Sequence, residues 1–91
     1  MGLFSYSKES IQNEIDGKLK WIETEKKKIE YLKRDIDAER IRIKNNPKNA
    51  NLKAYAKQVI ETRKKDIECI KAIIAHEKEQ IASLRERKKN A

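Results

Sequence analysis

The chain has 91 residues, enough for one small domain but too few for the core of a large enzyme. Charged residues make up 42% of the chain and aromatic residues 5%, with two glycines and one proline, which excludes a β-sheet protein because sheets need turn residues and alternating β-branched or aromatic positions. The formal net charge is +8, concentrated in residues 46–91, which carry 12 Lys and Arg against 6 Asp and Glu. The second half is therefore the expected surface for an anionic partner.

The first six residues form an apolar N-terminal tip that lies outside the helical pattern of the rest of the chain. We expect this tip, residues 1–6, to pack over the end of the fold or to contact a partner through Leu3 and Phe4. It has neither a basic leader nor a long apolar stretch, so we do not expect a signal peptide. A single cysteine, Cys69, can form no internal disulfide and suits a reducing compartment. Together these features predict a cytoplasmic location.

A first helix is predicted over residues 7–45. Ser7 suits the N-cap position, and Glu9 falls in the first turn, where a carboxylate interacts favourably with the helix dipole. Tyr6 and Ile11 are spaced to form a hydrophobic staple around this cap. Isoleucine then recurs every seven residues, at Ile15, Ile22, Ile29, Ile36 and Ile43. This period is typical of the stripe that faces a partner helix in a left-handed coiled coil.

The segment from Asn45 to Asn51 contains four asparagines and the only proline, which predicts a hinge at residues 46–50. Pro47 disfavours helical geometry at Asn46. It also suits the first position of a new helix, for which Asn46 would be the cap.

A second helix is predicted over residues 51–91, ending in a basic tail. The seven-residue isoleucine series continues with Ile60, Ile67, Ile74 and Ile81. Because the hinge is too short for a parallel arrangement, the helices must return antiparallel. The sequence therefore predicts an all-α domain of two long helices in an antiparallel coiled-coil hairpin. If the isoleucines occupy heptad position a, charged residues occupy several d positions and weaken the seam: Lys18, Glu25, Glu39, Arg63 and Glu77.

Two registers of this hairpin fit the pattern. The first places Ile15 near Leu84 and Ile29 near Ile70, and the second, slipped by one heptad, places Ile22 near Ile70. We prefer the first register because it leaves a reasonable hinge.

The residue types that enzymes use are not grouped in this sequence. His76 is the only histidine, and Cys69 lies seven residues before it on the same predicted helix. No other soft ligand accompanies them, and no glycine-rich phosphate loop is present. We therefore expect no catalytic, metal or cofactor site, and no enzymatic activity.

Four apolar residues flank the predicted seam: Leu19, Trp21, Val59 and Ile73. They widen the apolar stripe beyond what one hairpin buries. The favoured hypothesis is a protein–protein interaction module that either dimerises into a four-helix bundle or captures a partner helix, with Leu3 and Phe4 as a second contact.

The alternative hypothesis is a sequence-independent nucleic-acid binder that uses the basic second helix. The residues expected to contact a polyanion are Arg63, Lys64, Lys65, Arg85, Arg87, Lys88 and Lys89. A solubilising charged surface would produce the same composition, because the interleaved acidic residues dilute the field.

The hinge sequence Pro47-Lys48-Asn49-Ala50-Asn51-Leu52, continuing to Gln58, resembles the turn of type III secretion needle subunits, which are also small helical hairpins. The resemblance implies a third hypothesis, a subunit or partner of a secretion or filament assembly. The C-terminus departs from that family, since Arg85–Lys89 stands where needle subunits carry an apolar polymerising end.

Overall fold

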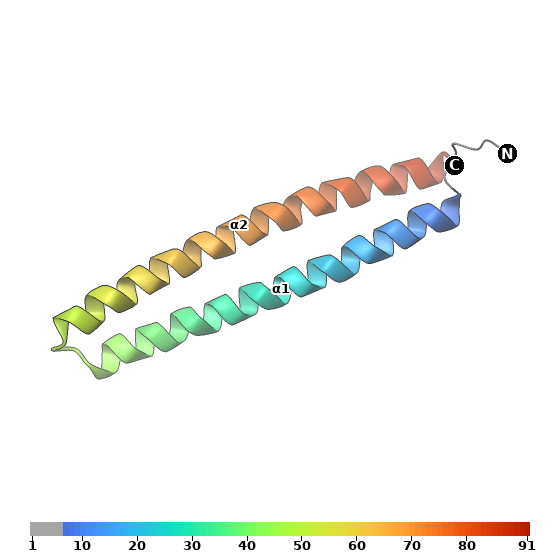
Figure 1. The fold of residues 1–91 in the computed structure, drawn as a ribbon. Helices are drawn as coiled ribbons and strands as arrows, with labels where there is room; N and C mark the ends of the chain where they lie inside the picture. Colours follow the sequence, from blue (N-terminus) through green and yellow to red (C-terminus); the bar gives the residue numbers. More distant parts are fainter. Residues whose placement is uncertain (1–6) are drawn as a thin grey trace.

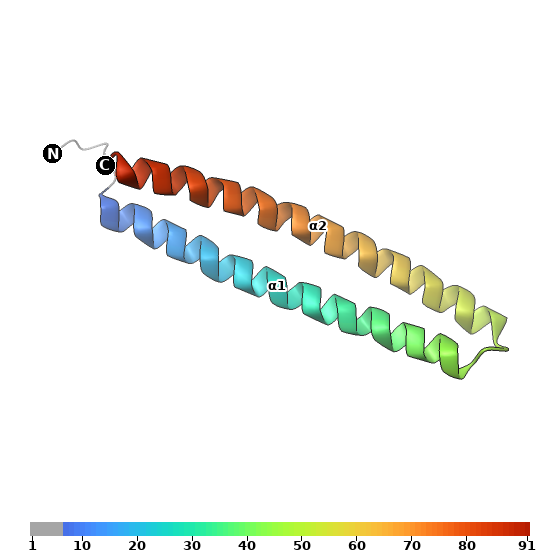
Figure 2. The ribbon, with the colours of Figure 1, turned by 180° about the vertical axis from the view of Figure 1, so that it is seen from behind.

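A computed structural model describes residues 7–91 as two long helices that lie side by side and run in opposite directions (Figure 1). Helix α1 spans Lys8–Asn45 and helix α2 spans Ala50–Lys89. The molecule is a rod with extents of 72 × 17 × 15 Å. The view from behind shows the start of α1 and the end of α2 together at one end of the rod, with the turn at the other (Figure 2). The predicted all-α hairpin is confirmed. The tip with Leu3 and Phe4, and the staple that involves Tyr6, lie outside the described residues.

The first helix begins where its sequence predicts. The Oγ atom of Ser7 accepts a hydrogen bond of 3.1 Å from the backbone N–H of Ser10. Glu9 lies in the first turn, and Arg42 and Lys44 lie in the last, so charges at both ends complement the helix dipole.

The turn differs in detail from the prediction. Asn46 does not cap the second helix: it is the C-cap of α1, and its side-chain amide donates a 2.9 Å hydrogen bond to the carbonyl of Arg42. The N-cap of α2 is Asn49, whose Oδ1 accepts a 3.0 Å hydrogen bond from the N–H of Leu52. Pro47 therefore lies in the turn between two asparagine caps. With one asparagine at each helix end, a carbonyl in the last turn of α1 and an N–H in the first turn of α2 are both hydrogen-bonded.

The core consists of the isoleucines that repeat every seven residues. Ile15 is the most deeply buried large side chain, with 1% of its surface exposed. The other buried members are Ile11, Ile22, Ile29, Ile36, Ile60, Ile67, Ile74, Ile81 and Leu84. Leu32, Ile43 and Ile70 pack against them and are partly buried. Each helix thus buries only a narrow stripe, and the hairpin leaves both of its long edges exposed to solvent.

Cross-helix contacts fix the register. The first predicted register places Gln12 opposite Arg87 and Asp35 opposite Lys64, whereas the slipped one places them opposite Gln80 and Lys57. In the structure, Gln12 accepts a 2.6 Å hydrogen bond from Lys88, and Asp35 lies 3.5 Å from the Nε atom of Arg63. Each partner is one residue from the position that the first register predicts, so the first register is the one that forms.

Charged residues at the core positions find partners along the seam. The ammonium group of Lys18 lies 2.9 Å from Glu77 and 2.7 Å from the Oε1 atom of Gln80 on α2. Glu25 is buried, with 5% of its surface exposed, and accepts a 2.9 Å hydrogen bond from Lys28 one turn further along α1. The seam is therefore a row of isoleucine contacts interrupted by polar contacts.

Gly17 lies in the middle of α1 and is not required there by geometry. A Cβ atom built on it meets nothing within 4 Å. We expect Gly17→Ala to raise the free energy of unfolding by about 0.5–1 kcal/mol, because alanine loses less backbone entropy in a helix. Urea unfolding at one low protein concentration measures the change. The reciprocal variant Ala38→Gly, also exposed on α1, should lower stability by a similar amount, and a destabilising Gly17→Ala would contradict the description of this site.

Candidate interaction surfaces

The two long edges of the hairpin are defined by their heptad positions. With the isoleucines at a, positions e and b of both helices lie on one side of the core, and positions g and c lie on the other. Contacts between the helices follow this division. Gln12, at an e position, contacts Lys88 on the first side. Lys18 contacts Gln80, and Asp35 contacts Arg63, on the second side. The two edges can therefore be compared residue by residue.

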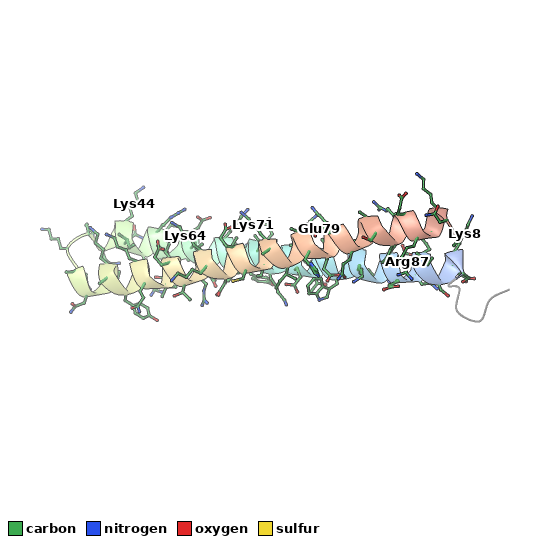
Figure 3. The ribbon with its side chains drawn as sticks, turned by 90° about the horizontal axis from the view of Figure 1, so that it is seen from above. Lys8, Lys44, Lys64, Lys71, Glu79 and Arg87 are labelled. Carbon is green, nitrogen blue, oxygen red and sulfur yellow. The ribbon has the colours of Figure 1, made fainter. Side chains whose placement is uncertain are left out.

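The first edge is strongly basic. Apart from Ala50 in the first turn of α2, its ten e positions from 12 to 85 hold eight Lys or Arg and no acidic residue, the exceptions being Gln12 and Leu19. We call these eight residues the cationic edge: Lys26, Lys33, Arg40, Lys57, Lys64, Lys71, Lys78 and Arg85. Lys64 and Lys71 extend to one side of the rod, together with Lys44 (Figure 3).

Acidic residues at b positions flank the cationic edge from the outside. They form exposed ion pairs one turn away along the same helix, such as Lys26 with Glu23 at 3.8 Å and Lys71 with Glu68 at 3.7 Å. Exposed pairs of this kind are weak and are screened by salt. Within residues 7–91, Lys33, Lys57, Lys78 and Arg85 form no ion pair. The edge therefore keeps a positive field over its length.

Two hollows lie on the cationic edge near the open end of the hairpin and share Arg85. The first has a volume of about 380 Å³, with Leu19, Ile22 and Ile81 as its apolar part. Its charged lining is Glu23, Lys26, Lys78 and Arg85. The second, of about 360 Å³, is lined by Lys8, Gln12, Arg85, Lys88 and Lys89. Six cations and one carboxylate thus line these two hollows.

The second edge has the opposite character. Its outer rim consists of the c positions from 10 to 83, which hold no charged residue in a chain that is 42% charged. These rim residues are Ser10, Gly17, Thr24, Tyr31, Ala38, Asn45, Tyr55, Thr62, Cys69, His76 and Ser83. Of the four apolar g residues inside the rim, Leu52 lies near the start of α2 and three lie further along the rod, Trp21, Val59 and Ile73. We call the rim and these three residues the uncharged face.

The structure separates the apolar residues that the sequence grouped as one interface. Trp21 is 40% exposed and Ile73 is 44% exposed, and both lie on the uncharged face with the half-buried Val59. Leu19 is also 40% exposed but lies on the cationic edge, in the hollow with Lys78 and Arg85.

The predicted polyanion contacts do not lie on one surface. Lys64 and Arg85 lie on the cationic edge, and Lys88 and Lys89 extend it at the open end. Arg63 lies on the other side, within 3.5 Å of Asp35 and 3.8 Å of Asp66. Arg87 lines a hollow with Glu14, and Lys65 is exposed at an f position, away from both edges. Six residues of the cationic edge were not among the predicted contacts: Lys26, Lys33, Arg40, Lys57, Lys71 and Lys78. Their seven-residue spacing was the available signal.

The described residues contain no group of three or more His, Cys, Asp or Glu side chains that could hold a metal ion. The Nε2 atom of His76 lies 3.0 Å from the side-chain amide of Gln80, and Cys69 is exposed with a free thiol. Neither α1 nor α2 combines the length and the apolarity needed to cross a membrane.

The chain was compared with protein-family models, with curated proteins and with solved structures, and none of the three comparisons finds a match.

Proposed function

We propose that this chain is a non-enzymatic protein–protein interaction module that pairs with a second copy through its uncharged face. The observation that carries the proposal is the exposure of Trp21 and Ile73, at 40% and 44%, beside a rim without charged residues. Large apolar side chains in a central, desolvatable position usually dominate such interfaces. Covering them removes apolar surface from water, at about 25 cal/mol per Å².

The charges on the two edges favour the uncharged face for pairing. The g positions from 14 to 87 carry three acidic and three basic residues, Glu14, Asp35, Asp66, Lys28, Arg42 and Arg87. These charges sum to zero, so a second copy is not repelled. The cationic edge would repel its own copy along its whole length. Two hairpins that meet through their uncharged faces form a four-helix bundle, the architecture in which narrow helical pairs commonly complete their core.

Sedimentation equilibrium tests this proposal with variants matched in chemistry. We expect the wild-type chain to form a dimer, and we expect Trp21→Ala and Ile73→Glu each to weaken dimerisation by about 10- to 100-fold, which corresponds to 1.4–2.8 kcal/mol. Leu19→Glu is the control, since Leu19 has the same exposure as Trp21 but lies on the cationic edge. It should leave the dimer unchanged.

Two results would overturn the proposal. A wild-type chain that is monomeric at every concentration excludes self-association and leaves capture of another protein's helix as the use of this face. Equal weakening by Leu19→Glu and Ile73→Glu would show that the association does not depend on the uncharged face.

A further inference from the structure

We propose that the cationic edge binds the sugar-phosphate backbone of single-stranded nucleic acid, independently of base sequence. Its eight Lys and Arg residues form two antiparallel rows, one on each helix, and neighbours in a row are seven positions apart. At 1.5 Å per residue this spacing is about 10 Å, so the cations recur at short, regular intervals along the groove. The six cations that line the two hollows at the open end are its densest part.

The arrangement of charges across this edge selects a narrow ligand. The e positions lie next to the groove between the helices, and the b positions lie further out. The order across the edge is therefore acidic, basic, groove, basic, acidic, with Glu23 outside Lys26 on α1 and Glu68 outside Lys71 on α2. A single strand in the groove meets the cations first. A flat anionic membrane would also press against the outer carboxylates, which opposes binding.

The scarcity of apolar groups on this edge disfavours a partner helix. Leu19 is the only large apolar residue among the ten e positions from 12 to 85. A docked helix needs a continuous apolar seam, because exposed ion pairs alone contribute about 0–1 kcal/mol each. A phosphate backbone needs only cations, since binding is driven by the release of its condensed counterions.

The positions of the aromatic residues indicate whether this edge can contact the bases of a strand. Within residues 7–91, the aromatic residues Trp21, Tyr31 and Tyr55 all belong to the uncharged face, so the described part of the cationic edge offers no ring on which a base could stack. Contacts are therefore made to phosphates, and the affinity should not depend on the sequence of the strand. A flexible strand can follow a straight groove, whereas the phosphates of a rigid duplex wind away from it. We therefore expect single strands to bind more tightly than duplexes.

This inference does not depend on dimerisation, because the two surfaces lie on opposite sides of the hairpin. Pairing through the uncharged face leaves both cationic edges exposed, and a monomer keeps its single edge. Failure of either proposal leaves the other intact.

Fluorescence anisotropy with a dye-labelled oligothymidylate tests the proposal on the full chain. The logarithm of the binding constant should fall linearly with the logarithm of salt concentration, with a slope of about −0.7 per phosphate neutralised. The test variant is Lys33→Gln, Lys57→Gln and Lys78→Gln combined. It removes three cations that form no ion pair and should weaken binding by about 10- to 100-fold at 0.1 M salt, with the slope reduced by about 2.

A charge-matched control separates this site from general attraction. Lys20→Gln, Lys27→Gln and Lys65→Gln combined remove the same charge from exposed f positions that point away from the groove. The proposal predicts a much smaller loss for this control, and equal losses in the two triple variants would overturn it. Helical content by circular dichroism should be the same in both. The assignment to single-stranded nucleic acid also fails if polyglutamate, a DNA duplex or phosphatidylserine vesicles bind as tightly as the oligothymidylate at equal salt.

Discussion

Replacing Ile15 by alanine is expected to lower the free energy of unfolding by about 2–4 kcal/mol, because it removes buried methyl and methylene groups and leaves a cavity that two rigid helices cannot close. Ile15 is 1% exposed and belongs to the core cluster with Leu84, which faces it in the observed register. A chain of 91 residues with a core one stripe wide has little stability in reserve, so this loss is a large part of the total. Urea unfolding followed by far-ultraviolet circular dichroism measures it.

The matched control for Ile15→Ala is Ile41→Ala. Ile41 lies on the same helix but is 58% exposed. The same chemical change there should alter stability by less than about 0.5 kcal/mol. Both variants are compared at one protein concentration, since the proposed dimerisation would make stability depend on concentration. Equal effects at the two positions would show that the isoleucine stripe is not buried as described.

Replacing Glu25 by leucine is expected to raise the free energy of unfolding by about 1–3 kcal/mol, whereas Ile15→Ala lowers it. Glu25 is 5% exposed at a core position that faces Ile74, and among residues 7–91 its one polar contact is the hydrogen bond from Lys28. The free energy needed to remove a carboxylate from water is larger than the stabilisation from one ion pair with an exposed lysine. Leucine at this position would extend the apolar seam without that cost.

Comparison with Glu25→Gln separates charge from shape. Glutamine keeps the length of the side chain and removes the charge, so its stability should fall between those of the wild type and Glu25→Leu. The thermal midpoint of each variant, measured at one protein concentration, gives the order. If Glu25→Leu is less stable than the wild type, the pair with Lys28 is a net stabilising interaction and this description of the seam is wrong.

Periodicity made the fold predictable. Nine isoleucines at seven-residue intervals, interrupted once by a proline and asparagine segment, allow few arrangements other than two helices that face each other. The register was only narrowed to two heptad alignments. The first was preferred because it leaves a reasonable hinge, and the contacts of Gln12 with Lys88 and of Asp35 with Arg63 decide in its favour. The detail of the turn was not accessible. Asn46 and Asn49 are equally good caps by residue type, and which helix each one caps depends on the path of the backbone between them.

The surfaces were harder to predict than the fold. Leu19 and Trp21 are two residues apart and equally exposed. The sequence pattern predicted that both flank the same apolar stripe. Only the antiparallel pairing of e with e and g with g puts them on opposite edges. The predicted basic residues also divide between the surfaces of the hairpin. The run Arg63-Lys64-Lys65 was predicted as one contact surface, but neighbouring residues on a helix point in different directions. Cations spaced by seven residues, by contrast, share one edge.

Under the two proposals, each edge of the hairpin binds a different kind of partner. The uncharged face offers apolar and aromatic side chains, and the charges at the neighbouring g positions sum to zero. This combination suits another protein surface. The cationic edge offers flexible ammonium and guanidinium groups with one apolar residue, which suits a phosphate backbone. A dimer formed through the first would carry two copies of the second on its outer sides. It would therefore bind one long strand at two sites and gain in avidity.

The most direct measurement of the proposed association is the fluorescence of Trp21, the only tryptophan of the chain, over a wide dilution series of the wild-type protein. Trp21 is 40% exposed in the single hairpin and is expected to become buried when the uncharged faces meet. Its emission should therefore shift to shorter wavelength as concentration rises, with a midpoint that matches the dimer dissociation constant from sedimentation. An emission maximum that stays constant while the chain dimerises would contradict the proposal, because it would place the interface away from Trp21.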